Sequence, residues 1–147
     1  MLKFAGVSNS RQTLLKQPKC INDLKHLHDR YVSFKFFNHI EPETPFITRN
    51  MEDHPPFKLI RNVGELCRIA VKFNNCAAIY VRKCLKGDMV HWLYKRNDDL
   101  ALLQVTFHGR LIKPRVSQFY GPNNTPASST AKHHCDKLLQ KIIETSA

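Results

Sequence analysis

The feature of this sequence that most constrains its fold is a stretch in which apolar and polar residues alternate. Residues 102–113 contain two alternating sets, Leu103, Val105 and Phe107 in one and Gln104, Thr106 and His108 in the other. A period of two is typical of a strand with one face against a core. Residues 89–95 and 115–120 are also strand-like, and residues 97–99 form a turn-like sequence between two of these runs. The sequence therefore predicts an antiparallel sheet.

Two stretches with helical spacing bracket these strands. The first covers residues 62–73, with Asn62 placed as its N-cap. The second begins near Ser128 or Ser129 and carries an apolar stripe formed by Ala131, Cys135, Leu138 and Ile142. Residues 77–84 fit either a strand or a continuation of the first helix. We expect an α+β fold of order α-β-β-β-α, an antiparallel sheet with two helices packed on one face, plus an N-terminal extension.

The length of the chain, 147 residues, fits one domain with an extension. We assign residues 1–56 to the extension, in which a short helix and a short strand precede several prolines that interrupt regular structure. Residues 57–147 form the predicted domain. The aromatic cluster of the extension suggests that the extension packs onto its own domain.

The net charge of +11 is concentrated in the predicted domain. Residues 1–56 carry eight Lys/Arg against six Asp/Glu, about +2, whereas residues 57–147 carry fifteen against six, about +9. A surplus of this size attracts polyanions, and above all nucleic acid. We therefore expect an RNA or ribonucleoprotein partner.

The sequence contains no recognisable catalytic or cofactor motif. Its five glycines form no phosphate-binding loop, and its Cys and His residues do not give four zinc ligands at a familiar spacing. We expect no cofactor, no metal and no enzymatic activity. No apolar run approaches a membrane span, so no membrane partner is expected. The odd number of cysteines favours free thiols inside the cell, nuclear or cytoplasmic, although the acid-free first 22 residues are also compatible with a mitochondrial transit peptide.

The two bracketing helices resemble those of a known family. Residues 62–71, Asn-Val-Gly-Glu-Leu-Cys-Arg-Ile-Ala-Val, are similar to the opening helix of double-stranded-RNA-binding domains. Residues 128–132, Ser-Ser-Thr-Ala-Lys, followed by Cys135 and Leu138, are similar to the family's closing helix. The resemblance covers about residues 58–144. It implies binding of A-form RNA by shape, across two minor grooves and the phosphates between them.

The chain departs from the family at the positions that contact RNA. Two of the three lysines at the entry to the closing helix are replaced by serines, which leaves Lys132. The acidic residue of the opening helix corresponds to Arg68, and the loop between the first two strands is reduced to residues 97–99. An insertion of roughly ten residues lies around Cys76 to Asp88. Each lost phosphate contact flattens the salt dependence of binding by about one unit of slope.

Two functions of different class follow from the resemblance and its departures. The first is a non-catalytic RNA-associated protein that joins a duplex or structured RNA or a ribonucleoprotein assembly; its candidate nucleic-acid-binding residues are Arg68, Lys72, Lys132, His133, Lys95 and Arg96. The second is a protein-protein interaction adaptor that has lost RNA binding and uses the exposed sheet face or the 76–88 insertion. A structural subunit of a mitochondrial ribosome has the same sequence features. Trp92 and Tyr94 either stack bases or belong to the core.

Overall fold

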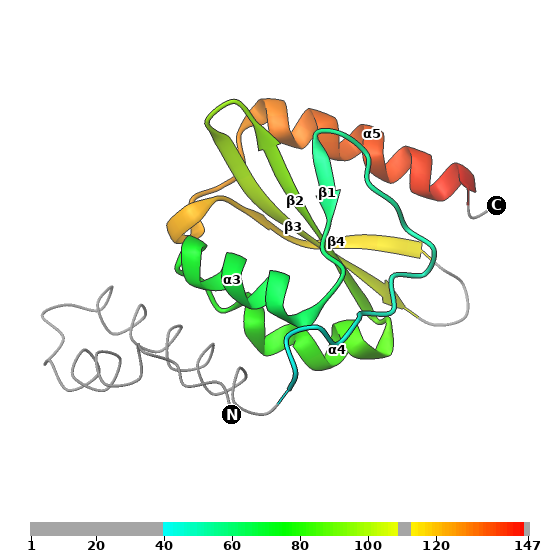
Figure 1. Ribbon diagram of the computed structural model, residues 1–147. Helices are drawn as coiled ribbons and strands as arrows, with labels where there is room; N and C mark the ends of the chain where they lie inside the picture. The colour runs from blue at the N-terminus through cyan, green and yellow to red at the C-terminus, as the bar shows by residue number, and fades with distance from the viewer. Residues whose placement is uncertain (1–39, 109–112, 146–147) are drawn as a thin grey trace, which may run out of the picture.

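The computed structural model describes residues 40–108 and 113–145, and within them it forms one antiparallel sheet with helices on both sides (Figure 1). The strands follow the order β1-β2-β3-β4, with bounds Phe57–Leu59, Met89–Arg96, Asp99–His108 and Lys113–Tyr120. The helices are α3 (Val63–Phe73), α4 (Val81–Lys86) and α5 (Ser129–Thr145), with short 3-10 turns η1 (Ala77–Tyr80) and η2 (Pro122–Asn124).

Both predicted helices are confirmed. The Asn62 side chain accepts from the backbone N–H of Glu65 and caps α3, and the four residues of the predicted stripe on α5 are its buried residues. Residues 77–84 are helical rather than extended, and α4 ends at Gly87, whose φ of 77° suits a residue without Cβ. The order α-β-β-β-α is wrong, because the three-residue strand β1 precedes α3 and pairs with β2.

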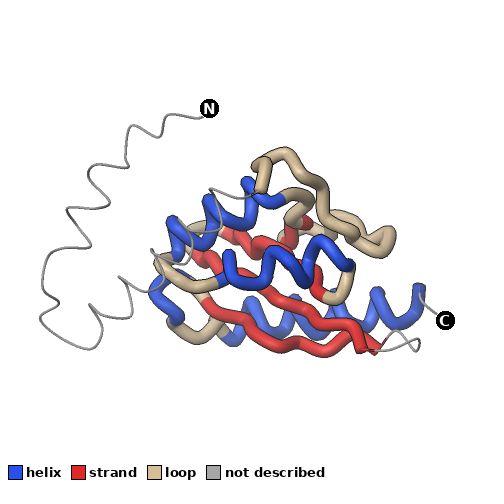
Figure 2. Tube along the Cα trace, turned by 90° about the horizontal axis from the view of Figure 1, so that it is seen from below, coloured by secondary structure: helices blue, strands red, loops and turns tan. Residues whose placement is uncertain are grey.

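The prediction that both helices pack on one face of the sheet is also wrong. The buried side chains of β2 divide between the two faces: Val90, Trp92 and Tyr94 pack with α5, whereas Met89 and the half-buried Leu93 pack with α3 and α4. In β3 the same division continues, and Figure 1 shows α5 on one side of the strands and α3 and α4 on the other. Seen from below, the helices on the α3 and α4 side of the sheet cross in front of the strands (Figure 2). The sheet face that an adaptor was expected to expose is therefore largely covered.

Residues 40–56, the described part of the predicted extension, lie against the domain. The Thr44 carbonyl accepts from the Val63 N–H at 3.1 Å, and the Pro42 carbonyl accepts from the Gly64 N–H at 2.8 Å. These N–H groups belong to the first turn of α3, where the helix itself supplies no acceptor. Phe46 packs against the core on the α3 side. The short helix and strand predicted before residue 40 lie outside the described residues.

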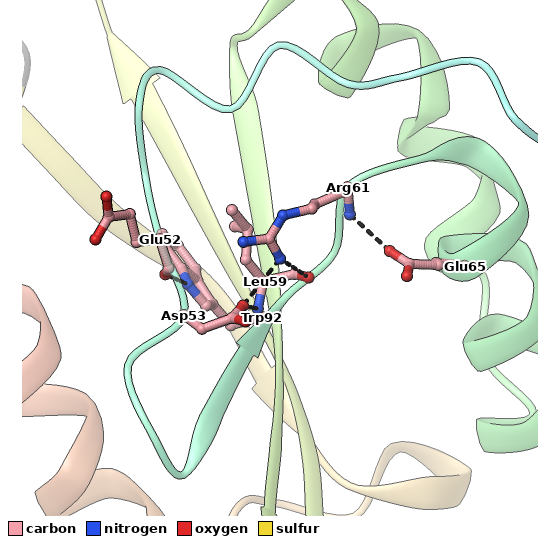
Figure 3. Close-up of polar contacts among 6 residues, drawn as sticks. All are labelled: Glu52, Asp53, Leu59, Arg61, Glu65 and Trp92. Carbon is pink, nitrogen blue, oxygen red and sulfur yellow. Dashed lines mark hydrogen bonds and ion pairs between the residues drawn. The ribbon is translucent and has the colours of Figure 1, made fainter.

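The outer edge of β1 is closed by side chains (Figure 3). The Asp53 carboxylate accepts from the Leu59 N–H at 2.7 Å, and the Arg61 guanidinium donates to Asp53 and to the Leu59 carbonyl at 2.9 and 3.2 Å. His54 pairs with both main-chain groups of Phe57. Because these groups are occupied, β1 offers no free ladder to another strand.

The other edge strand, β4, is protected by a different device. The N–H of Phe107 donates to the Asp88 carbonyl on the β2 side, so Pro114, the β4 partner of Phe107, presents its main chain outward. Proline has no N–H to offer there. The register shift opposite Gln104 and Val105 disturbs the ladder further, and the Phe119 carbonyl already accepts from Ala127.

Replacement of Asp53 by Ala should open the β1 edge and lower the free energy of unfolding by about 1 kcal/mol, because the ion pair is half exposed. The Arg61 guanidinium and then the Leu59 N–H hold the pKa of Asp53 below its ordinary value. The stabilisation is therefore complete at neutral pH and disappears as the pH falls through the lowered pKa. Urea unfolding of wild type, Asp53→Ala and the control Arg115→Ala, an exposed residue of β4, measures this at neutral and acidic pH. Equal stability of the two variants at neutral pH would contradict it.

Candidate nucleic-acid interface

A cleft of about 240 Å³ runs between the β1–β2 edge of the sheet and helix α3. We call it the β1–α3 cleft; it is lined by Lys58, Ile60, Glu65, Arg68, Ile69, Lys72 and Leu93. Its lining combines three apolar side chains with three cations and one carboxylate. An apolar surface bordered by cations suits a ligand that is both anionic and partly apolar, and a nucleic-acid strand is of this kind.

Local structure explains why the three cations meet. Lys58 is the exposed residue of β1, between buried Phe57 and Leu59, so the strand turns its side chain away from the α5 core. Arg68 and Lys72 lie four residues apart and therefore share one face of α3. Pairing of β1 with β2 brings that strand beside the helix that follows it.

The acids near the cleft already have partners. The Glu65 carboxylate accepts from the backbone N–H of Arg61 at 2.8 Å, and Asp53 is paired with the Arg61 side chain (Figure 3). Among the described residues, Lys58, Arg68 and Lys72 form no ion pair. These three cations exceed the one carboxylate of the cleft lining, Glu65, so a net positive charge is available to an external anion.

A second basic group lies on the opposite face of the sheet. We call it the α5 corner; it consists of Arg96, His133, His134 and Lys137. The Tyr94 hydroxyl lies 3.1 Å from Nδ1 of His134 and fixes that ring against the sheet. Desolvation, then the positive charges of Arg96, His133 and Lys137, lowers the pKa of His134. Partial burial is the main cause of this shift, and the neighbouring cations act in the same direction.

The two helix N-termini are not free anion sites. In α3 the first N–H groups donate to the residue 40–56 segment and to Asn62. In α5 the Ser128 hydroxyl accepts from the Ala131 N–H and donates to the Asp99 carboxylate. A carboxylate at this end of the helix occupies the position that favours negative charge and repels phosphate. The entry to α5, where the family resemblance implied RNA contacts, is therefore unfavourable for them.

The structure divides the six residues predicted to bind nucleic acid into two groups of three. Arg68, Lys72 and Lys95 belong to the α3 side, Lys95 because it follows Leu93 by two positions on β2. Arg96, Lys132 and His133 belong to the α5 side. One continuous surface made from both helices, as the resemblance implied, is therefore not assembled. Lys58 was not predicted as a site residue. The only indication of it in the sequence is its position between two apolar residues, Phe57 and Leu59.

Trp92 and Tyr94 are core residues and have no exposed ring face for a base, since both are 0% exposed. Trp92 donates to the Glu52 carbonyl at 3.0 Å. No group of three or more His, Cys, Asp or Glu side chains within residues 40–108 and 113–145 is arranged to hold a metal ion. The described helices are also too short or too polar to cross a membrane.

A buried chain of polar groups runs through the α3 side of the sheet. It links Cys84 Sγ to His91 Nδ1 at 3.4 Å, His91 Nε2 to Gln104 Oε1 at 3.1 Å, and Gln104 Nε2 to Ser117 Oγ at 3.0 Å. Because the Gln104 amide donates to Ser117, its oxygen faces His91 and accepts from Nε2–H. His91 Nδ1 is then the acceptor for the Cys84 thiol.

A thiol, an imidazole and an amide in this order formally resemble a nucleophile, its base and an orienting group. Burial argues for a structural role of this chain of groups. Cys84 is 0% exposed and His91 is 1% exposed. Desolvation raises the pKa of Cys84 to about 12 and lowers the pKa of His91 to about 4. Both shifts favour the neutral pair over the thiolate and imidazolium that nucleophilic chemistry needs.

Burial of neutral His91 should make the protein sensitive to acid. The unfolded state takes up this proton near pH 6.5 and the folded state only near pH 4, so stability is retained above the first value and lost between the two. The loss is roughly 3 kcal/mol. Urea unfolding at neutral pH and near pH 4 measures it, with His91→Gln as the non-titrating comparison. The prediction fails if wild type and variant lose the same free energy.

Comparisons of the chain with protein-family models, with curated proteins and with solved structures find no match. The functional proposal for this chain therefore rests on the geometry of its own residues.

Proposed function

We propose that this chain is a non-catalytic RNA-associated protein that holds an RNA strand in the β1–α3 cleft. The observation that carries the proposal is the convergence of Lys58, Arg68 and Lys72, from two different elements, on one cleft. None of the three is neutralised by an ion pair within the described part of the chain. Phosphate contacts of this kind supply most of the affinity of non-specific nucleic-acid binding.

The geometry favours a single strand over a duplex. A double-stranded-RNA-binding surface spans two successive minor grooves and uses both helices together. Here the helices lie on opposite faces, and Asp98 in the β2–β3 turn and Asp99 at the start of β3 lie between their basic residues. A cleft of about 240 Å³ is much smaller than such a surface. Its half-buried aliphatic side chains, Ile69 and Leu93, suit the sugars and base faces of one strand.

A specific observation also keeps the adaptor function as a second candidate. On the side of α3 and α4, Val71 and Ile79 are 54% and 38% exposed. Ile79 belongs to the 76–88 insertion. Exposed apolar residues of this size occur at protein-protein contacts, although scattered ones are normal on any surface. A protein partner would contact these residues, and its binding would resist high salt.

The proposal is tested by titrating fluorescent single-stranded and duplex RNA at two salt concentrations. The triple variant Lys58→Ala, Arg68→Ala, Lys72→Ala should bind the single strand more weakly and reduce the salt slope by about 2, because about 0.7 counterion per phosphate contact is no longer released. The matched control is Arg82→Ala, Lys83→Ala, Lys86→Ala, which removes the same charge from α4.

The two triple variants separate local binding from general attraction. A control that retains the wild-type affinity and slope supports the cleft. A control that weakens binding as much as the cleft variant would show that net charge alone is responsible and would overturn the proposal. Absence of RNA binding by the wild-type chain would overturn it as well, and a salt-resistant protein complex lost on Val71→Ser would favour the adaptor.

A further inference from the structure

The second basic group, the α5 corner, is not used by the function proposed above. Arg96 lies on the α5 face of the sheet because it follows Tyr94 by two positions on β2. His133, His134 and Lys137 lie on α5, where residues three and four apart are neighbours. Arg96 and Lys137 form no ion pair with any described residue. The corner keeps a net positive charge, because Arg96 and Lys137 together exceed its one acid, Asp99, which stands opposite Arg96 on β3 and accepts from the Ser128 hydroxyl.

The corner is also held in place. Tyr94 is fully buried beneath it and packs edge-on against Phe119, with ring centroids 6.3 Å apart. Its hydroxyl contacts Nδ1 of the partly buried His134, whose ring centroid lies 5.8 Å from that of Tyr94. When Tyr94 donates to Nδ1, the other ring nitrogen of His134 carries the hydrogen and is free to donate. A positioned donor beside an arginine and a lysine is a phosphate-binding combination.

The corner and the cleft are separate surfaces. Lys95 and Arg96 are neighbours in the chain, but strand alternation places them on opposite faces. An RNA strand that passed from one face to the other around the end of the β2–β3 hairpin would meet Asp98 and Asp99. The Asp99 carboxylate accepts from the Ser128 hydroxyl at the start of α5. The carboxylates would repel a phosphate backbone that tried to follow this path. One strand cannot cross from cleft to corner there without this repulsion.

We propose that the α5 corner is a second RNA-binding site and that a single chain thereby joins two RNA segments, one on each face of its sheet. This inference rests on the proposed function of the β1–α3 cleft. Arg96 and Lys137 contact phosphates, and the exposed His133 ring offers a face to a base. The acid on the exposed side of this part of α5, Asp136, lies three residues after His133 and one before Lys137, so it neighbours the histidine and not the lysine.

Stoichiometry is the direct test. The full chain is mixed with an excess of single-stranded oligonucleotides of about six nucleotides, too short to reach both faces, and native mass spectrometry counts them per chain. Wild type should carry two. The cleft variant Lys58→Ala, Arg68→Ala, Lys72→Ala and the corner variant Arg96→Ala, His133→Ala, Lys137→Ala should each carry one. Far-UV circular dichroism verifies that both variants fold.

Bridging is measured by energy transfer between two RNAs that carry different dyes. Wild type should bring them together with one chain per complex, and each variant should reduce the transfer to the level of RNA alone. One oligonucleotide per wild-type chain, lost in the cleft variant and kept in the corner variant, would overturn the bridging inference while the proposed function stands. One oligonucleotide lost in the corner variant alone would instead overturn the proposed function, and with it the bridge.

Discussion

The covering of both faces of the sheet depends on one cross-strand pair, His91 and Gln104. These residues stand opposite each other on β2 and β3 and point to the α3 side, where a polar side chain without a partner would be strongly unfavourable. Each satisfies the other, Cys84 completes the chain at the α4 end, and Ser117 completes it on β4. With these groups satisfied, α3 and α4 can cover the second face of the sheet while α5 covers the first.

The position of the basic surfaces follows from that arrangement. In a sheet covered on one side only, cations from both helices would share a common rim. Here the sheet separates them, so Arg68 and Lys72 meet the β1 strand while Lys137 meets the end of β2. The acids Asp53 and Glu65 are hydrogen-bonded within the β1 region and form no ion pair with Lys58, Arg68 or Lys72. The same covering of the sheet thus determines both the core and the distribution of charge.

Much of this fold is predictable from the residues, and its main error has a physical cause. The spacing of apolar residues predicts α3 and α5 well, because each helix has one buried stripe. The alternation between Leu103 and Phe107 suggested a sheet with one buried face. However, the nearly continuous apolar run 89–94 is typical of strands buried on both faces. The buried polar residues His91 and Gln104 made the second face look exposed, since a polar residue in a strand is usually exposed.

The candidate site was harder to predict than the core. Charged residues at the surface carry no periodic signal, so Arg68 and Lys132 could be named but not assigned to different faces. β1 has only three residues and follows two prolines, which left no detectable strand and concealed Lys58. The contact between the Cys84 thiol and the His91 imidazole has no signal in the sequence, because the two residues lie seven positions apart on different elements. Such pairs arise only from tertiary structure.

The role of residues 40–56 has a consequence for how the molecule can be divided. A fragment beginning at Phe57 contains every strand and helix described, yet it lacks the carbonyls of Pro42 and Thr44 that complete the start of α3 and the carboxylate of Asp53 that closes β1. The outer main-chain N–H and C=O groups of its first strand would then be unpaired and could pair with the edge strand of a neighbouring copy. Residues 40–56 are therefore part of the folded unit, because they complete the start of α3 and close the outer edge of β1.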